Sequence, residues 1–185
     1  MTTRILICYG SSEGQTASIA ERIGDVLEDE GHEVVLVHAK HPPSDFDIGA
    51  SDGALVGASI HMGSHQRYVT EFVRRHVDEL NRLPSAFFSV SLTAAGDDVE
   101  SEKTTHELID AFCAETGWEP NRTLAVAGAL RYSQYGLLKR FVMRRIAGKA
   151  GGDTETSRDH EYTDWDEVET FAREFGTDVV SPDPN

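Results

Sequence analysis

The sequence predicts an α/β fold in which helices cover both faces of one doubly wound, parallel, five-stranded sheet. Two observations support this prediction: short, nearly continuous apolar runs recur along the chain, and amphipathic helical segments separate them. The length of 185 residues suits a single domain. With this spacing of strands we expect the order 2-1-3-4-5 and a ligand site at the carboxyl ends of strands 1 and 3.

The predicted strands are short runs of aliphatic and β-branched residues, as expected of strands buried on both faces. The first run is RILICY, and the second, EVVLVH, follows soon after a glycine. Pro84 precedes the fourth run. In chain order, the five strands cover residues 4–9, 33–38, 52–59, 86–92 and 123–129.

Helices are predicted where apolar residues recur at helical spacing. In the first helix, Ile19, Ile23 and Leu27 share one face, and Gly31 provides a C-terminal stop. The last helix starts in the sequence TDWD, which supplies a cap and first-turn acids. The four helices cover residues 17–30, 67–80, 104–116 and 166–175. We expect one domain over residues 1–176 and a flexible tail over 177–185.

The composition is strongly acidic, with 32 Asp and Glu against 17 Lys and Arg and a net charge of −15. The bases are 13 Arg and only 4 Lys. A surface poor in lysine and rich in acids is expected of a halophilic protein; an ordinary acidic cytosolic protein is the alternative. Either way, the negative charge argues against nucleic-acid binding, because it repels phosphates.

The sequence contains no sign of secretion, of a membrane span or of a metal site. The N-terminus lacks the apolar core and cleavage site of a signal peptide, and no apolar run approaches the roughly 18 residues of a span. Cys8 and Cys113 cannot form a disulfide framework, and no Cys/His cluster has zinc spacing. We therefore expect a cytoplasmic protein.

A loop rich in glycine and hydroxyl residues, GSSEGQT, joins the first strand to the first helix. Converging backbone N–H groups and the positive end of a helix can bind a phosphate there without a basic residue. The loop matches neither the GxGxxG pattern of dinucleotide sites nor the GxxxxGK[ST] pattern of nucleoside triphosphatases. It is similar to the phosphate loop of flavodoxins, which bind FMN. A simple strand-to-helix turn with serine and threonine caps is the alternative.

Further motifs follow the other strands. GASIHMGSH follows the third strand, PSAFF and SVSLT span the fourth, and AGALRY, GGDT and YTDW lie closer to the C-terminus. Together they resemble the flavodoxin-like, menaquinone-dependent protoporphyrinogen oxidase (dehydrogenase) family, over nearly the whole chain from about residue 4 to residue 175. The resemblance implies a flavodoxin-like fold, FMN as cofactor, and oxidation of a porphyrinogen with a membrane quinone as acceptor.

The resemblance also implies which residues bind the cofactor. The phosphate loop contributes Ser11, Ser12, Glu13, Gly14, Gln15 and Thr16. The flavin ring is lined by Ala58, Ser59, Ile60, His61, Met62, Gly63, Ser91, Leu92 and Thr93. Because a carboxylate repels a phosphate, we expect the Glu13 side chain to turn to solvent.

Two of these positions depart from the family, which has Arg- and Tyr-like residues where this chain has His61 and Met62. His61 is a candidate proton donor, or only a contact of the flavin. The resemblance implies no catalytic side chain, since flavin chemistry belongs largely to the cofactor.

A basic insert, defined as residues 131–152, contains six bases and no acid; since the whole chain carries −15, the rest carries −21. Its apolar residues, among them Leu137, Leu138 and Phe141, share one arc of a predicted additional helix. The insert is a membrane-surface helix, a docking site for an anionic partner, or a helix packed on the domain. Candidate contacts with substrate or membrane are Arg131, Tyr132, Tyr135, Lys139, Arg140, Arg144, Arg145 and Lys149.

The sequence therefore predicts an FMN-dependent oxidoreductase of the protoporphyrinogen-oxidising type. Its expected partners are a porphyrinogen, a membrane quinone, and the inner face of the cell membrane, which the basic insert would contact. A quinone is confined to the bilayer, so the enzyme needs a surface that reaches it. The alternatives are a flavodoxin-type electron carrier without enzymatic activity and a quinone reductase on the same scaffold.

The charge balance predicts that salt stabilises the fold. Raising the salt concentration from ~0.1 M to ~2 M should raise the thermal unfolding midpoint, because screening relieves the repulsion between acidic side chains. Melting curves recorded across this range measure the effect. A midpoint that does not change with salt would remove the halophilic interpretation and leave the FMN prediction untouched.

Overall fold

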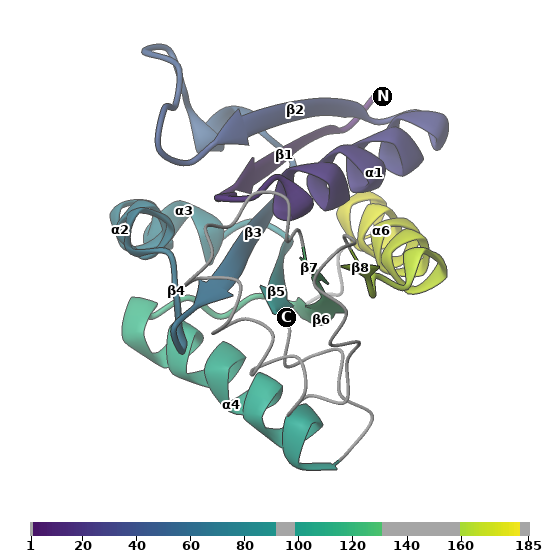
Figure 1. The fold of residues 1–185 in the computed structure, drawn as a ribbon. Helices are drawn as coiled ribbons and strands as arrows, with labels where there is room; N and C mark the ends of the chain where they lie inside the picture. Colours follow the sequence, from purple (N-terminus) through teal and green to yellow (C-terminus); the bar gives the residue numbers. More distant parts are fainter. Residues whose placement is uncertain (1, 92–98, 131–159, 182–185) are drawn as a thin grey trace.

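The fold of this chain is given by a computed structural model, which describes residues 2–91, 99–130 and 160–181 (Figure 1). Its centre is a parallel sheet of five main strands in the order β2-β1-β3-β5-β6. These strands are β1 (Arg4–Tyr9), β2 (Glu33–His38), β3 (Gly53–His61), β5 (Ser85–Ser91) and β6 (Arg122–Ala127). The predicted α/β class and the predicted order of the main strands are confirmed.

Helices cover both faces of this sheet (Figure 1). One face is packed against α1 (Gln15–Asp29) and α6 (Trp165–Val180), and the other against α2 (Arg67–Arg75), α3 (Val77–Leu80) and α4 (Val99–Thr116). Within the described ranges, no helix has both the length and the apolar character needed to cross a bilayer.

Four short elements complete the described structure. A 3-10 helix, η1 (Ile48–Ala50), precedes β3, and β4 (Ser64–His65) pairs with the end of β3. Strands β7 (Ala129–Leu130) and β8 (His160–Glu161) form a separate antiparallel pair. The basic insert lies between β7 and β8 and outside the described residues.

Two predicted helices differ from the observed ones. The predicted helix over residues 67–80 is divided into α2 and α3 at His76, whose φ of −117° is not helical. Its N–H is shared between two carbonyl groups of the preceding turn. Helix α4 begins at Val99, five residues before the predicted start at residue 104.

The C-terminal helix is longer than predicted. Helix α6 ends at Val180, whereas we expected it to end at residue 175 and a tail to begin at 177. Residues 177–180 are helical because Val179 is buried in the core, where it packs against Gly53 at the start of β3. The rest of the predicted tail, from residue 182, lies outside the described residues.

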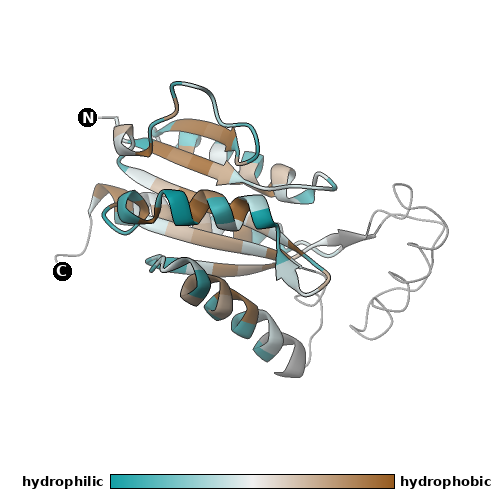
Figure 2. Cartoon of the chain, turned by 90° about the vertical axis from the view of Figure 1, so that its left-hand side faces the viewer, coloured by the Kyte–Doolittle hydropathy of each residue, from teal (hydrophilic) through white to brown (hydrophobic). Residues whose placement is uncertain are grey.

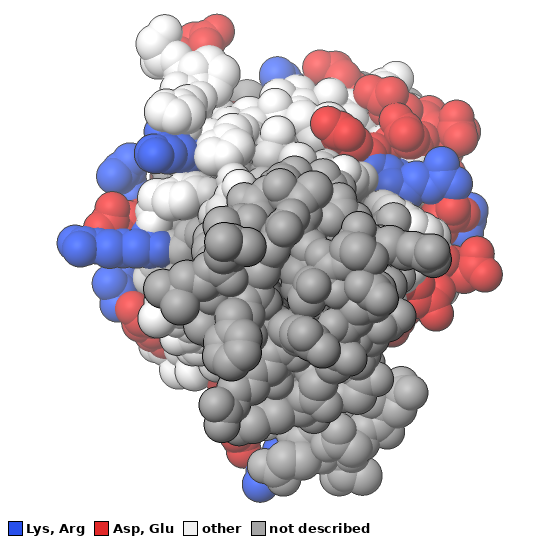
Figure 3. All heavy atoms as spheres, viewed as in Figure 1, with Lys and Arg blue, Asp and Glu red and all other residues white. Residues whose placement is uncertain are grey.

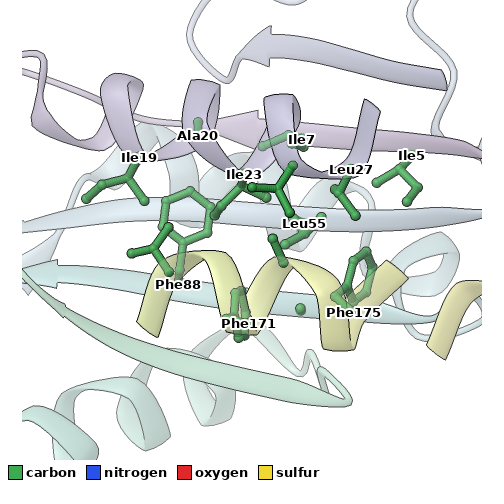
Figure 4. Packing of buried hydrophobic residues seen from close by; sticks show 14 of the residues in the cluster. Ile5, Ile7, Ile19, Ala20, Ile23, Leu27, Leu55, Phe88, Phe171 and Phe175 are labelled. Carbon is green, nitrogen blue, oxygen red and sulfur yellow. The ribbon is translucent and has the colours of Figure 1, made fainter. Parts of the chain in front are cut away.

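The core on the α1 and α6 side is built from the residues that predicted the first helix. Ile19, Ile23 and Leu27 of α1 are fully buried and point toward the aromatic rings of Phe171 and Phe175 on α6 (Figure 4). Burial of side chains of this size contributes about 1.5–3 kcal/mol each. Hydrophobic residues are concentrated on the strands between the helical layers, as Figure 2 shows.

The core on the other face is aromatic. Phe87 of β5 stacks on Phe112 of α4, with ring centroids 4.6 Å apart, and Trp118 meets Phe87 edge-on. The indole N–H of Trp118 donates to Ser85 Oγ at 3.0 Å, so its polar atom is satisfied inside the core.

The charged side chains are arranged unevenly on the outside. Figure 3 shows acidic side chains over α1 and α6 and basic side chains over α2. The outer face of α1 carries exposed acids at Glu21, Asp25, Glu28 and Asp29. Their close spacing on one helix is the arrangement that salt screening should stabilise.

Gly57 of β3 packs tightly against Phe88, its partner on β5. A Cβ atom at position 57 would lie 2.0 Å from the Phe88 ring, so the ring occupies the space that any other residue would need. The β3–β5 pairing therefore requires glycine at this position while Phe88 is present.

We expect Gly57→Ala to lower the free energy of unfolding by about 1–3 kcal/mol, the usual cost of overpacking a core. Combining it with Phe88→Leu should cost less than the sum of the two single changes, because the smaller side chain leaves room for the new methyl group. Urea unfolding of the three variants at fixed high salt measures this coupling. Strictly additive effects would show that the ring does not fill this space.

Candidate flavin-binding site

The strands that carry or precede the predicted flavin-binding residues end at one edge of the sheet. Strands β1, β3 and β5 are neighbours and run in parallel, so their carboxyl ends lie together. The Gly10 N–H donates to the Gly57 carbonyl at 2.8 Å, which fixes the start of the first loop against β3. Ser91 ends β5 and is buried. Leu92 and Thr93, predicted to line the flavin ring, lie outside the described residues.

The phosphate loop folds around Gly14. This residue has a left-handed backbone conformation, with φ of 90°, and its N–H donates to Ser11 Oγ at 2.9 Å. It directly precedes α1, and no side chain caps this helix. The first turn of α1 contains no acid, so the positive end of the helix dipole faces the loop. This geometry fits a phosphate group.

Gln15 and Thr16, also predicted to bind the phosphate, are buried at the start of α1. The Gln15 side chain does not point into the loop: its Nε2 donates to Thr163 Oγ1 at 2.8 Å. Thr163 in turn donates to the Ala127 carbonyl at the end of β6, also at 2.8 Å. Gln15 therefore ties the phosphate loop to the segment that enters α6. The YTDW motif contained this anchor, but we interpreted it only as part of the family resemblance and as a helix cap, a role that Asp164 fills.

The residues predicted to line the ring form a hairpin at the end of β3. Met62 and Gly63 both have positive φ, 53° and 84°, as in the tight two-residue turns of hairpins. Met62 is fully exposed at the tip. Ser59, Ile60 and His61 precede the turn and are partly exposed.

Ala58 differs from these residues, because its side chain is buried in the core between β3 and α2. Its methyl group therefore does not line the cradle.

Gln66, which the sequence analysis missed, connects the hairpin to the phosphate loop. Its Oε1 accepts from the Ser59 N–H at 2.9 Å, and its Nε2 donates to Ser59 Oγ and to the Gly10 carbonyl. Tyr68 reinforces the same junction through a hydrogen bond with the Ser11 backbone. Burial raises the pKa of the Tyr68 phenol, and this hydrogen bond partly opposes the rise. The phenol therefore stays neutral at physiological pH.

We had expected the Glu13 side chain to turn to solvent, but the structure places it largely inside the site. Its side chain is only 18% exposed, and its Oε1 lies 4.0 Å from His61 Nδ1. The expectation was wrong because it considered repulsion from a phosphate and omitted a histidine 48 residues away in sequence. The phosphate loop and the ring hairpin are thus in contact through this pair.

His65, on β4, has a structural role. Its ring packs against both Phe87 and Phe112, and its Nε2 lies 2.8 Å from Ser89 Oγ. Burial lowers its pKa to about 4, so it remains neutral at physiological pH. The eight candidate residues of the basic insert, from Arg131 to Lys149, all lie outside the described residues.

Comparison with known proteins agrees with this architecture. Residues 6–157 match the flavodoxin domain family. A flavodoxin from the domain Archaea superposes with a TM-score of 0.56 at 17% identity, covering 96% of this chain and 99% of that one. A short-chain flavodoxin associated with a PDU bacterial microcompartment gives a TM-score of 0.58 at 12% identity, covering 97% and 99%. The chain has a flavodoxin domain, which implies flavin binding.

Two relatives in sequence narrow the assignment. The chain is 35% identical over 174 residues to the protoporphyrinogen IX dehydrogenase (quinone) of Escherichia coli strain K12, covering 93% of this chain and 94% of the relative. It is 32% identical over 172 residues to the enzyme of the same name from Leishmania major, covering 93% and 74%. The chain belongs to this protoporphyrinogen IX dehydrogenase family.

We predict that Thr16→Ala weakens FMN binding by about 1–2 kcal/mol, a five- to thirtyfold rise in Kd, because one hydrogen bond to a charged phosphate is lost. Quenching of FMN fluorescence on titration with protein measures the Kd. Thr70→Ala is the matched control, since Thr70 is also buried but lies on α2, where its hydroxyl bonds its own helix. Equal Kd values for the two variants would show that Thr16 does not contact the phosphate.

Proposed function

We propose that the protein is an FMN-dependent oxidoreductase that oxidises protoporphyrinogen IX and transfers the electrons to a membrane quinone. The observation that carries this proposal is the match to two dehydrogenases of this specificity over 93% of the chain. It is supported by the three neighbouring strands β1, β3 and β5, whose carboxyl ends lie at one sheet edge, and by the uncapped start of α1, which suits the FMN phosphate.

FMN, when bound, supplies two-electron redox chemistry, and the six-electron conversion of protoporphyrinogen to protoporphyrin therefore needs three cycles. The chain would contribute position and electrostatics. Gly14 and the first turn of α1 would hold the phosphate, and the hairpin from Ser59 to Gly63 would lie against the flavin ring. Ser91 would flank the ring from β5.

We assign the contact with quinone and membrane to the basic insert. The backbone on either side of the insert is described: Leu130 pairs with His160, and Gly128 N–H donates to the Ser91 carbonyl at 3.0 Å. The chain thus leaves the sheet beside Ser91, at the edge of the flavin site. A segment with six bases attached there can approach both anionic headgroups and the flavin. We therefore propose that the protein works in the cytoplasm, peripheral to the inner face of the cell membrane.

The decisive experiment is an anaerobic turnover assay with protoporphyrinogen IX and FMN-loaded protein. With a quinone in liposomes as acceptor we expect sustained formation of porphyrin, followed by its fluorescence. A protein that binds FMN but oxidises no porphyrinogen, and instead exchanges electrons only with a reductase partner, would be an electron carrier. A protein that reduces quinone with another electron donor, but does not oxidise porphyrinogen, would be a quinone reductase.

Variants of the basic insert form the second arm of this assay. Replacing Lys139, Arg140, Arg144 and Arg145 with Ser should weaken association with anionic liposomes in low salt, since each base contributes about 1 kcal/mol near such a surface. Replacing Leu138 and Phe141 with Ser should weaken it in high salt as well, where burial of apolar surface carries the binding. Both variants should lose turnover with quinone more than turnover with a soluble dye. Unchanged sedimentation and quinone turnover would exclude a membrane role for the insert.

A further inference from the structure

Glu13 and His61 connect the two halves of the flavin cradle. Glu13 lies in the phosphate loop, and His61 is the last residue of β3 at the base of the ring hairpin. The distance between Glu13 Oε1 and His61 Nδ1 is 4.0 Å, and the other ring nitrogen, Nε2, lies 3.3 Å from Ser59 Oγ. Each nitrogen of the imidazole therefore faces an oxygen atom that can accept a hydrogen bond from a ring N–H.

The hydrogen bonds around Ser59 allow either charge state of the histidine. The Ser59 N–H donates to Gln66 Oε1, which fixes the orientation of the Gln66 amide and makes its Nε2 a donor to Ser59 Oγ. A hydroxyl oxygen has two lone pairs, so it can also accept from His61 Nε2–H. With neutral His61, the same hydroxyl can rotate and donate to Nε2 instead.

Among the described residues, one oxygen of the Glu13 carboxylate has only His61 as a possible partner. Its Oε1 is buried and has no hydrogen-bond partner among the described residues. Within the described part of the chain, Glu13 is also the one acid within 4.0 Å of the His61 ring nitrogens. On the neighbouring elements, His65 faces Ser89 and Arg67 pairs with Glu71, so neither of these groups neutralises the pair.

A phosphate bound to this loop would bring about two further negative charges close to the buried carboxylate. The dipole of α1 supplies the equivalent of about half a positive charge, which does not balance the phosphate and Glu13 together. A cation between the two loops would offset one more of these negative charges, and a protonated His61 stands at that place, 4.0 Å from Glu13 Oε1. The neutral form would leave two unscreened anions beside each other in a partly buried site.

We propose that His61 takes up one proton from solvent when FMN binds, and that the resulting Glu13–His61 ion pair holds the phosphate loop against the ring hairpin. His61 is then a positioning residue whose charge makes FMN affinity depend on pH. This inference rests on the FMN binding in the proposed function and does not depend on the identity of the substrate.

Titrations of FMN between pH 6.0 and 8.5, at constant high salt, test the proposal. Above the pH range in which histidine ordinarily titrates, the Kd of the parent protein should rise with pH more steeply than the Kd of His61→Gln. Uptake of one proton makes this difference at most tenfold per pH unit. The titration of the phosphate itself is common to both proteins, so the difference belongs to His61. Calorimetry in two buffers of different ionisation enthalpy measures the protons taken up on FMN binding. The parent should take up close to one proton more than His61→Gln.

Three further variants separate charge from shape. His61→Lys keeps a positive charge and should bind FMN more tightly than the parent at pH 8.5, with the shallower pH dependence of His61→Gln. Glu13→Gln removes the repulsion of the phosphate and should bind FMN more tightly than the parent at pH 8.5. His41→Gln, an exposed histidine in the loop after β2, is the matched control and should follow the parent.

Melting curves of the apo-proteins check that each variant folds. If the Kd values of the parent and of His61→Gln change with pH in the same way, the proposed ion pair is wrong, while FMN binding and the proposed function still stand. A parent protein that binds no FMN at any pH would overturn the proposed function and this inference together.

Discussion

Strands β1, β3 and β5 form a continuous ladder of parallel backbone hydrogen bonds, and the position of every candidate site residue in the described structure depends on it. Tyr9 is paired with Gly57, and Ser59 with Val90, so the three strands end at nearly the same level. Because parallel strands share their direction, the segments that follow them must begin at one edge. The close contact between Gly57 and Phe88 holds two of these strands in register at the level of the site.

Much of this arrangement could be predicted from the sequence. Apolar runs such as RILICY are typical of strands buried on both faces, and they predicted the α/β class. The spacing of these runs along the chain then predicted the strand order. The loops at the carboxyl ends then followed from the order. Boundaries were less predictable: β3 extends to His61 because two residues of β4 pair with it, and α6 continues because Val179 finds a buried position. Neither partner is visible in the local sequence.

The polar contacts within the site could not be predicted for the same reason. Gln66 and Thr163 have ordinary sequence surroundings, and their roles come from partners that only the fold brings close. Glu13 illustrates the difficulty most clearly, since local electrostatics pointed it toward water while the hairpin supplied a histidine. Sequence patterns describe the apolar interior well, because burial repeats with a period, whereas a single hydrogen bond between distant residues leaves no periodic signal.

The link between Gln15 and Thr163 also bears on when the protein can acquire its cofactor. The two residues are 148 positions apart, and their hydrogen bond joins the beginning of the first helix to the entry of the last. During synthesis, the phosphate loop is made early, but its anchor is made only after β6 and everything that precedes α6. The nascent chain can therefore form much of its sheet while the loop remains untethered. Capture of flavin is expected to be a late event, completed when the C-terminal helix docks against α1.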